Sequence, residues 1–159
     1  QKIQEYWGKF PHTFYKIDFV RYLILEKFGG IYLDLDVVCK IPLNNSYYIG
    51  FWEDKKKSNY KINNNIICLE KSLYPKLINY SLEQFDYREI SMPKSWVVRK
   101  FQNTVSAGMF RKFIKNNKSK KEIEKMLEKF KINFNAEYAD YNYQWNIYGK
   151  KNKFSKHLE

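Results

Sequence analysis

Two aspartates spaced two residues apart, Asp34 and Asp36, are the side chains of this sequence best suited to chemistry. They follow a short apolar run at residues 31–33, whose β-branched and aromatic side chains predict a buried strand. Residues two apart in an extended chain point to the same side, so both carboxylates are expected to face one site. Two such carboxylates repel each other, and a divalent cation such as Mn²⁺ or Mg²⁺ removes that repulsion. A solvated turn is the alternative for an isolated Asp-x-Asp tripeptide.

The elements that would position this pair lie directly before it in the chain. Large apolar residues recur with a helical period between residues 14 and 28, which predicts a helix with one buried face. The members of that face are Phe14, Ile17, Val20, Leu23, Ile24 and Phe28. Gly29 and Gly30 follow, and glycine is the residue that most readily ends a helix in a left-handed conformation. The aspartate pair therefore closes a helix–turn–strand unit, which favours a site over a solvated turn.

Asp18 and Arg21 form a second candidate pair on the predicted helix. They are three residues apart and so share one helix face. A surface ion pair worth under about 1 kcal/mol is one interpretation. The other is that Arg21, on the helix before a metal-binding strand, holds a sugar hydroxyl or a phosphate with its fork of donors.

The segment DFVRYLILEKFGGIYLDLD at residues 18–36 resembles the sugar-binding, Asp-x-Asp region of glycosyltransferase family 32. That family includes mannosyltransferases and capsular-polysaccharide enzymes, and it is similar to the glucosylating domains of large bacterial cytotoxins. The resemblance is close over residues 16–43 and loose in the part of the chain that follows. It implies a GT-A fold, a nucleotide-sugar donor, a divalent metal and transfer with retention at the anomeric carbon.

Matched position by position, the resemblance implies individual roles. Asp18 and Arg21 would contact the donor sugar, and Asp34 would meet the sugar or the ribose. Asp36 would bind the metal directly, with Asp34 as a second candidate ligand. Tyr32 would lie near the nucleotide. We name no protein nucleophile, because no residue in the sequence can be singled out for that role.

A run of three asparagines begins a predicted strand at residues 63–69. It resembles the Asn-led strand that follows the metal motif in the family, which implies that Asn64 or Asn65 hydrogen-bonds the donor. A simple turn is the alternative for consecutive asparagines. Another strand is predicted at residues 48–52, followed by a charged loop at residues 53–61.

The second half of the chain carries mainly structural patterns. Apolar spacing predicts helices at residues 73–85 and 109–116. Ser119 followed by Glu122 has the pattern of a capping box and predicts the start of a further helix, and residues 132–134 are a strand candidate.

An aromatic, polar segment at residues 137–146 lies near the C-terminus. Family relatives usually carry a segment containing His and Trp there, which closes over the diphosphate. By that resemblance Trp145 would stack on a sugar, and Asp140 or Asn146 would contact the metal or a phosphate. Aromatic packing at the end of a sheet is the alternative.

The length of 159 residues and an apolar content of 44% fit one domain with a core. We expect an α/β domain over residues 1–159, with a mostly parallel, GT-A-like sheet flanked by helices. Only 17 residues precede Asp18, whereas GT-A enzymes begin with a strand–helix unit that holds the nucleotide base. We therefore expect a fragment that lacks part of that unit. Leu158 and Glu159 could come from an expression vector.

The net charge of +12 is best explained by solvated lysines, because no motif of a nucleic-acid-binding module accompanies it. No apolar run is long enough for a transmembrane span, and no signal peptide is recognisable. Cys39 and Cys68 are interpreted as free, buried thiols, which favours a reducing, cytoplasmic location.

The predicted function is metal-dependent transfer of a hexose from a UDP- or GDP-sugar to a glycan or protein acceptor, with no nucleic acid expected as a partner. A non-catalytic fragment that binds nucleotide sugars is one alternative. A basic nucleic-acid-binding domain is the other.

Overall fold

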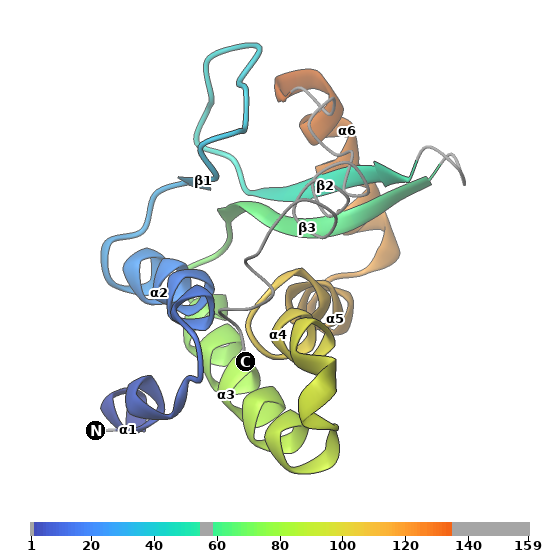
Figure 1. The fold of residues 1–159 in the computed structure, drawn as a ribbon. Helices are drawn as coiled ribbons and strands as arrows, with labels where there is room; N and C mark the ends of the chain where they lie inside the picture. The colour runs from blue at the N-terminus through green and yellow to red at the C-terminus, as the bar shows by residue number, and fades with distance from the viewer. Residues whose placement is uncertain (1, 55–58, 135–159) are drawn as a thin grey trace.

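Helices and strands of this chain combine in a mixed α/β arrangement, as predicted. The computed structural model describes residues 2–54 and 59–134 (Figure 1). The helices are α1 (Lys2–Lys9), α2 (Thr13–Phe28), α3 (Leu73–Ser91), α4 (Val97–Thr104), α5 (Ala107–Asn117) and α6 (Lys120–Asn133), with a short 3₁₀ helix η1 (Lys94–Trp96). The strands are β1 (Tyr32–Leu33), β2 (Tyr48–Asp54) and β3 (Asn59–Cys68).

The sheet that the structure describes is antiparallel. Its strand order is β1-β3-β2, and both neighbouring pairs run in opposite directions. The prediction of a mostly parallel sheet is therefore wrong for these residues. The reason is the short connection between β2 and β3, since residues 55–58 suffice for a hairpin whereas a parallel pair needs a crossover of a dozen or more residues. The predicted charged loop at residues 53–61 is accordingly much shorter.

A β-bulge divides β3 into two parts with different partners. Ile49 of β2 pairs with Ile67, but the next β2 residue, Gly50, pairs with Asn63. The β3 residues between these two positions have no partner in the β2 register, and one of them, Ile66, pairs instead with Leu33 of β1. The bulge thus releases the middle of β3 toward β1 and α2, in keeping with the bends that bulges introduce next to functional sites.

The α2 helix has nearly the predicted bounds and the predicted end. Gly29 has φ 71°, and its backbone N–H donates to the Leu25 carbonyl oxygen at 2.9 Å. Gly30, with φ 87°, is also left-handed. The two glycines therefore turn the chain from α2 into β1 as expected.

The buried face of α2, however, differs from the prediction. Ile17, Ile24 and Phe28 are 55%, 49% and 74% exposed. The residues that are buried instead are Tyr15, Asp18, Phe19, Arg21, Tyr22 and Leu25. The prediction followed the aliphatic spacing and gave no weight to tyrosines, whose rings pack in the core while their hydroxyls find hydrogen-bond partners.

Helices cover both sides of this sheet. α2, α4 and α5 gather with α3 below the sheet in Figure 1, and α5 packs directly on β3. α6 packs on β2 from the other direction. Contacts between rings fasten the helices together, because Phe85 of α3 packs on Tyr15 of α2 and Tyr22 of α2 stacks on Phe110 of α5. None of the described helices is long and apolar enough to span a membrane.

Among the remaining local predictions, one is confirmed and two need correction. The capping box is present, with the Ser119 hydroxyl accepting from the Glu122 N–H and the Glu122 carboxylate accepting from the Ser119 N–H. The expected strand at residues 132–134 is wrong, since α6 continues to Asn133 and leaves only an isolated bridge between Phe134 and Cys39. The expected burial of Cys39 is also wrong, because that free thiol is exposed.

Candidate functional site

Five residues singled out from the sequence meet where α2, β1 and β3 come together. They are Asp18 and Arg21 of α2, Tyr32 of β1, Asp34 directly after β1, and Asn64 of β3. We call this group the Arg21 cluster, because each of the other four members contacts the Arg21 side chain or one of its partners. The bulge in β3 brings Asn64 to this position.

Arg21 joins the three elements through one side chain. Its Nη2 donates to Asp18 Oδ1, while its Nη1 donates to Asp34 Oδ1 at 3.2 Å and to the Asn64 carbonyl oxygen at 3.1 Å. Its guanidinium also lies over the Tyr32 ring, 4.5 Å from the ring centroid. The Arg21 side chain is only 6% exposed, and its contacts hold the Asp18 and Asp34 carboxylates in fixed positions.

The charges in the Arg21 cluster shift each other's protonation. Burial acts against the charge of Arg21, but the attraction of Asp18 and the groups around it raises the pKa of that guanidinium overall. Burial raises the pKa of the Asp34 carboxyl, although the Tyr32 hydrogen bond and the Arg21 charge act in the opposite direction. Burial, followed by the hydrogen bond to Asp34, also raises the pKa of Tyr32. Tyr32 therefore stays a neutral donor at physiological pH, giving Asp34 Oδ1 a hydrogen bond of 2.6 Å.

Tyr22 is a member of this network that sequence reasoning quoted but gave no role. Asn64 Nδ2 donates to Asp18 Oδ2 at 3.2 Å and to the Tyr22 hydroxyl oxygen at 3.3 Å. The Tyr22 hydroxyl in turn donates to the Val105 carbonyl oxygen at 2.7 Å, which links the cluster to the start of α5. Its position four residues after Asp18, on the same helix face, is the signal that could have found it.

The two candidate asparagines are placed differently. Asn64 is buried and contributes its amide to the Arg21 cluster. Asn65 contributes its backbone, because its carbonyl oxygen accepts from the Asp34 N–H at 2.8 Å. The Asn65 Oδ1 atom is buried, with no hydrogen-bond partner among the described residues. Asn64 thus supports Asp18 through its side chain, whereas Asn65 holds the Asp34 segment through its backbone.

Asp36 lies outside the Arg21 cluster and is exposed. β1 ends at Leu33, and the Val37 N–H donates to the Asp34 carbonyl oxygen at 3.0 Å, so residues 34–37 form a turn. The extended geometry that was expected to align Asp34 with Asp36 is therefore not the geometry of this segment. The two carboxylates instead differ in environment, one held by Arg21 and Tyr32 and the other open to solvent.

The Asp34 and Asp36 carboxylates fit a divalent metal ion that binds together with the substrate. Both hydrogen bonds that the structure gives the Asp34 carboxylate end on Oδ1, and Asp36 is exposed. Among residues 2–54 and 59–134, no group of three or more His, Cys, Asp or Glu side chains could hold a metal alone. Mg²⁺ and Mn²⁺ commonly take one or two carboxylates and fill the remaining positions with water and substrate phosphate, and Asp34 and Asp36 meet that requirement.

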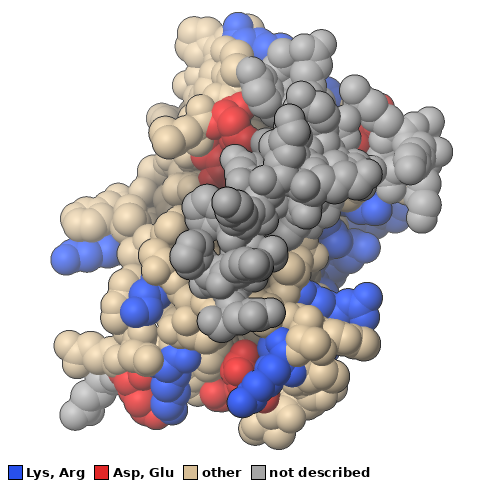
Figure 2. All heavy atoms as spheres, viewed as in Figure 1, with Lys and Arg blue, Asp and Glu red and all other residues tan. Residues whose placement is uncertain are grey.

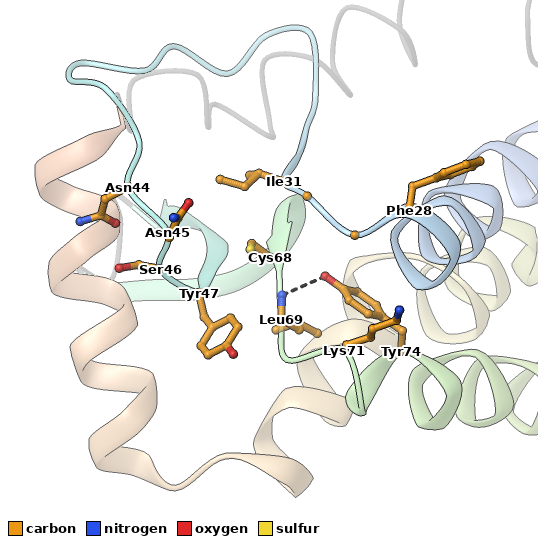
Figure 3. Close-up of a pocket in the computed structure, with 12 residues that line it drawn as sticks. Phe28, Ile31, Asn44, Asn45, Ser46, Tyr47, Cys68, Leu69, Lys71 and Tyr74 are labelled. Carbon is orange, nitrogen blue, oxygen red and sulfur yellow. Dashed lines mark hydrogen bonds between the residues drawn. The ribbon is translucent and has the colours of Figure 1, made fainter.

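A pocket of about 450 Å³ lies beside the turn that leads into β1 (Figure 3). It is bounded by the end of α2, the segment at residues 44–47 and the chain that leaves β3. The Leu69 N–H donates to the Tyr74 hydroxyl oxygen at 2.9 Å in its wall. No member of the Arg21 cluster lines this pocket.

Two further expectations concern the tail and the charge. Trp145, Asp140 and Asn146 lie outside the described residues, so their predicted roles stay predictions. On the face drawn in Figure 2, Lys and Arg lie in separate groups, with Asp and Glu between some of them.

Comparison with known proteins bears on the same region. A family model described as a glycosyltransferase sugar-binding region containing a DXD motif matches residues 1–49. Inositol phosphoceramide mannosyltransferase 3 of Schizosaccharomyces pombe is 38% identical over 65 residues, which are 41% of this chain and 18% of that protein. A glycosyltransferase of Acanthamoeba polyphaga mimivirus is 44% identical over 48 residues, 30% of this chain and 19% of its own length.

A second mannosyltransferase of S. pombe, inositol phosphoceramide mannosyltransferase 1, is 46% identical over 35 residues, 22% of this chain and 11% of its own. Each of these matches spans less than a fifth of the relative's length. No solved structure gives a significant match. The match at residues 1–49 confirms the family resemblance, since this part of the chain is similar to glycosyltransferase sugar-binding regions that contain a DXD motif.

Proposed function

We propose that the chain acts in the metal-dependent transfer of a hexose from a UDP- or GDP-sugar to a glycan or protein acceptor, with retention at the anomeric carbon. The observation that carries the proposal is the Arg21 cluster, in which one buried guanidinium fixes Asp18 and Asp34 next to the exposed Asp36. These four residues all lie within the matched sugar-binding region. The matches span less than a fifth of each relative's length, so they do not establish the activity of the whole protein, and we propose that activity here.

Asp36 and Asp34 would hold Mn²⁺ or Mg²⁺. When bound, the metal supplies positive charge beside the diphosphate leaving group. The raised pKa of Asp34 reflects a carboxylate that is poorly solvated, and a cation would compensate for that burial. Asp36 is exposed and therefore free to approach the metal and the diphosphate together.

The remaining residues would position the donor. Asp18 has both carboxylate oxygens hydrogen-bonded inside the protein, to Arg21 and Asn64, and this fixed carboxylate would contact the sugar hydroxyls. Arg21 would orient the sugar mainly by holding Asp18 and Asp34, since little of its own side chain is exposed. Fixed geometry of this kind lowers the entropic cost of bringing donor and acceptor together.

Tyr32 would lie near the nucleotide, with its hydroxyl already committed to Asp34. Asn64 and Asn65 would support the donor side of the site, and Trp145 would stack on a sugar.

Isothermal titration of UDP- and GDP-sugars against the chain tests this proposal, first with Mn²⁺ and then with EDTA. Asp36→Asn is the test variant, and Glu83→Gln is its matched control, because it removes one exposed carboxylate from α3. We expect binding that requires Mn²⁺, is lost in Asp36→Asn and is kept in Glu83→Gln. Binding without turnover would support the non-catalytic alternative. If none of the UDP- and GDP-sugars bound detectably, the result would contradict a donor site in this chain.

A further inference from the structure

The pocket of about 450 Å³ lies along the same two strands that carry the Arg21 cluster (Figure 3). Ile31, which lines it, comes three residues before Asp34, and Cys68, in another wall, comes four residues after Asn64. At about 3.3 Å per residue of strand, the pocket is therefore about 10–13 Å along β1 and β3 from the cluster. Its volume lies in the range of small-molecule binding sites.

Tyr74 of α3 is a buried polar side chain in the wall of this pocket. The residue is only 2% exposed, and Figure 3 shows its hydroxyl pointing toward Leu69 in the chain that leaves β3. The hydroxyl oxygen accepts from the Leu69 N–H, but its O–H donates to none of the described residues. Burial raises the pKa of Tyr74 to about 12, so the hydroxyl keeps its proton at physiological pH. A buried donor without an acceptor costs free energy, and a ligand in the pocket would supply the acceptor.

Residues 44–47 form the wall across the pocket from Tyr74 (Figure 3). The buried Tyr48 anchors this segment, because its hydroxyl donates to Asn44 Oδ1 at 2.6 Å and accepts from Asn133 Nδ2 at 3.1 Å. The segment is thus held in place before any ligand arrives, which lowers the entropic cost of binding.

The side chains beyond this anchor have polar groups to offer. The Asn45 amide and the Ser46 hydroxyl make no hydrogen bond with the described residues. The Tyr47 ring is 47% exposed and packs on no other described ring. Lys71 is the one charged side chain among the described residues that line the pocket, and it forms no ion pair with any of them.

This set of groups matches a ligand that is rich in hydroxyls and largely uncharged. Amides and hydroxyls both donate and accept hydrogen bonds, as the hydroxyls of a sugar do. The half-exposed Tyr47 ring offers an apolar face on which the C–H groups of a sugar ring can pack. A diphosphate, in contrast, is best held by several cations, and the described lining provides only Lys71.

We propose that this pocket binds a sugar unit of the acceptor glycan. Tyr74, Asn45 and Ser46 supply hydrogen bonds to its hydroxyls, and Lys71 adds a donor. The Tyr47 ring packs on its C–H face. The identity of the ligand as an acceptor rests on the proposed function, in which it selects a glycan over a protein.

The distance between the pocket and the Arg21 cluster defines what the pocket does. The sugar unit bound here is not the one that receives the hexose, because the cluster lies several strand residues away. It is another unit of the same glycan, and its binding positions the acceptor. Unlike binding of the donor at Asp36, binding in this pocket needs no metal.

Saturation-transfer difference NMR of the full chain in EDTA tests the proposal, with methyl α-mannoside, methyl α-glucoside and methyl α-galactoside as probes. We expect saturable binding of at least one probe in the roughly millimolar range, weakened about tenfold by Tyr47→Leu and about fivefold by Asn45→Ala. Tyr87→Leu and Asn79→Ala are the matched controls, since both residues are exposed on α3 outside the pocket. No saturable binding of any probe, or equal weakening by the test and control variants, would overturn the proposal.

Tyr74→Phe tests the buried hydroxyl. The variant keeps the ring but also removes the acceptor of the Leu69 N–H, so its Tm should fall, and its sugar binding below that Tm should weaken about fivefold. Tyr47→Leu and Asn45→Ala remove no hydrogen bond of the described structure and should leave Tm nearly unchanged. A loss of Tm in these two variants as large as that in Tyr74→Phe would count against their role as ligand contacts.

Asp36→Asn separates this inference from the proposed function. The variant should abolish metal-dependent binding of nucleotide sugars and leave binding of the methyl glycoside intact, so each proposal can fail alone. A saturating nucleotide sugar with Mn²⁺ should not displace the methyl glycoside from the unmodified chain. Displacement would assign the pocket to the donor and overturn its assignment to the acceptor.

Discussion

Arg21 pairs with Asp18 on its own helix and with Asp34 beyond β1, so one guanidinium couples α2 to the aspartate motif. The pairing accounts for an arginine and an aspartate on a helix face that would otherwise be filled by apolar residues. It also means that the carboxylates depend on Arg21 for their charge balance.

Replacing Arg21 by Met should therefore destabilise the fold severely. Two carboxylates would lose their cation in a largely buried setting, and breaking such pairs costs about 3 kcal/mol or more. Urea unfolding monitored by circular dichroism measures the loss. Lys27→Met on the exposed side of α2 is the control, and it should change stability by less than about 0.5 kcal/mol. Equal effects of the two variants would show that Arg21 does not hold the cluster together.

Asn64→Asp should turn a hydrogen bond into a repulsion. Asn64 Nδ2 lies 3.2 Å from Asp18 Oδ2, so a carboxylate there would face a carboxylate. We expect a loss of about 2 kcal/mol at pH 7. Repulsion raises the pKa of the pair in the folded state, so the loss should be smaller at pH 5, where the pair more readily takes up a proton.

Asn63→Asp is the control for that change on the same strand. Its side-chain oxygen accepts from the Asn64 N–H at 2.7 Å, and a carboxylate oxygen can keep that bond. Tm measured at both pH values should change little in Asn63→Asp. A loss in Asn64→Asp that does not depend on pH would argue against charge repulsion as its cause.

Gly50→Ala should disturb the bulge that shapes the site. A Cβ atom at Gly50 would lie 1.7 Å from Asn65 Oδ1 and 3.0 Å from the Asn63 carbonyl oxygen. Overpacking of this kind costs about 1–3 kcal/mol. Gly8→Ala in α1 is the matched control, with no heavy atom within 4 Å of its Cβ, and it should stabilise by about 0.5 kcal/mol. Thermal unfolding of both variants measures the two changes in Tm, which should have opposite signs. Changes of the same sign would contradict the packing argument.

The raised pKa of Asp34 predicts a particular dependence of stability on pH. The folded state binds this proton more tightly than the unfolded state, so protonated Asp34 adds stability that is lost as pH rises through the raised pKa. The difference in unfolding free energy between wild type and Asp34→Asn should therefore fall as pH rises from about 4, near the ordinary carboxyl value. Urea unfolding between pH 3.5 and 6.5 measures it. A difference that rises over this interval would mean that the Arg21 pairing outweighs burial.

Local patterns predicted much of the unit that carries the site. The apolar period and the two glycines located α2 and its end, and the family motif selected residues that the structure brings together around Arg21. These features depend on neighbours within a few positions in the chain. Hence they can be recognised without knowledge of the rest of the fold.

Features that depend on distant partners were not predicted. The side of α2 that is buried is decided by α3 and α5, which receive Tyr15 and Tyr22 rather than Ile17 and Ile24. The turn at residues 34–37 and the antiparallel sheet follow from pairings with β3. Strand register is a tertiary property, and the alternation of side chains in β3 alone does not reveal the bulge.

The bulge at Ile49 and Gly50 has a consequence for how such chains can diverge. Beyond it, the described residues of β2 and β3 form strand pairs only with each other, whereas Asn64 and Asn65 on the near side contact Arg21 and Asp34. Insertions and deletions in the outer hairpin can therefore accumulate over evolution without moving the carboxylates. A single residue gained or lost between Asn64 and Ile67 would displace the carboxylates at once. The number of residues in the outer hairpin can therefore vary, whereas the number between Asn64 and Ile67 is under selection.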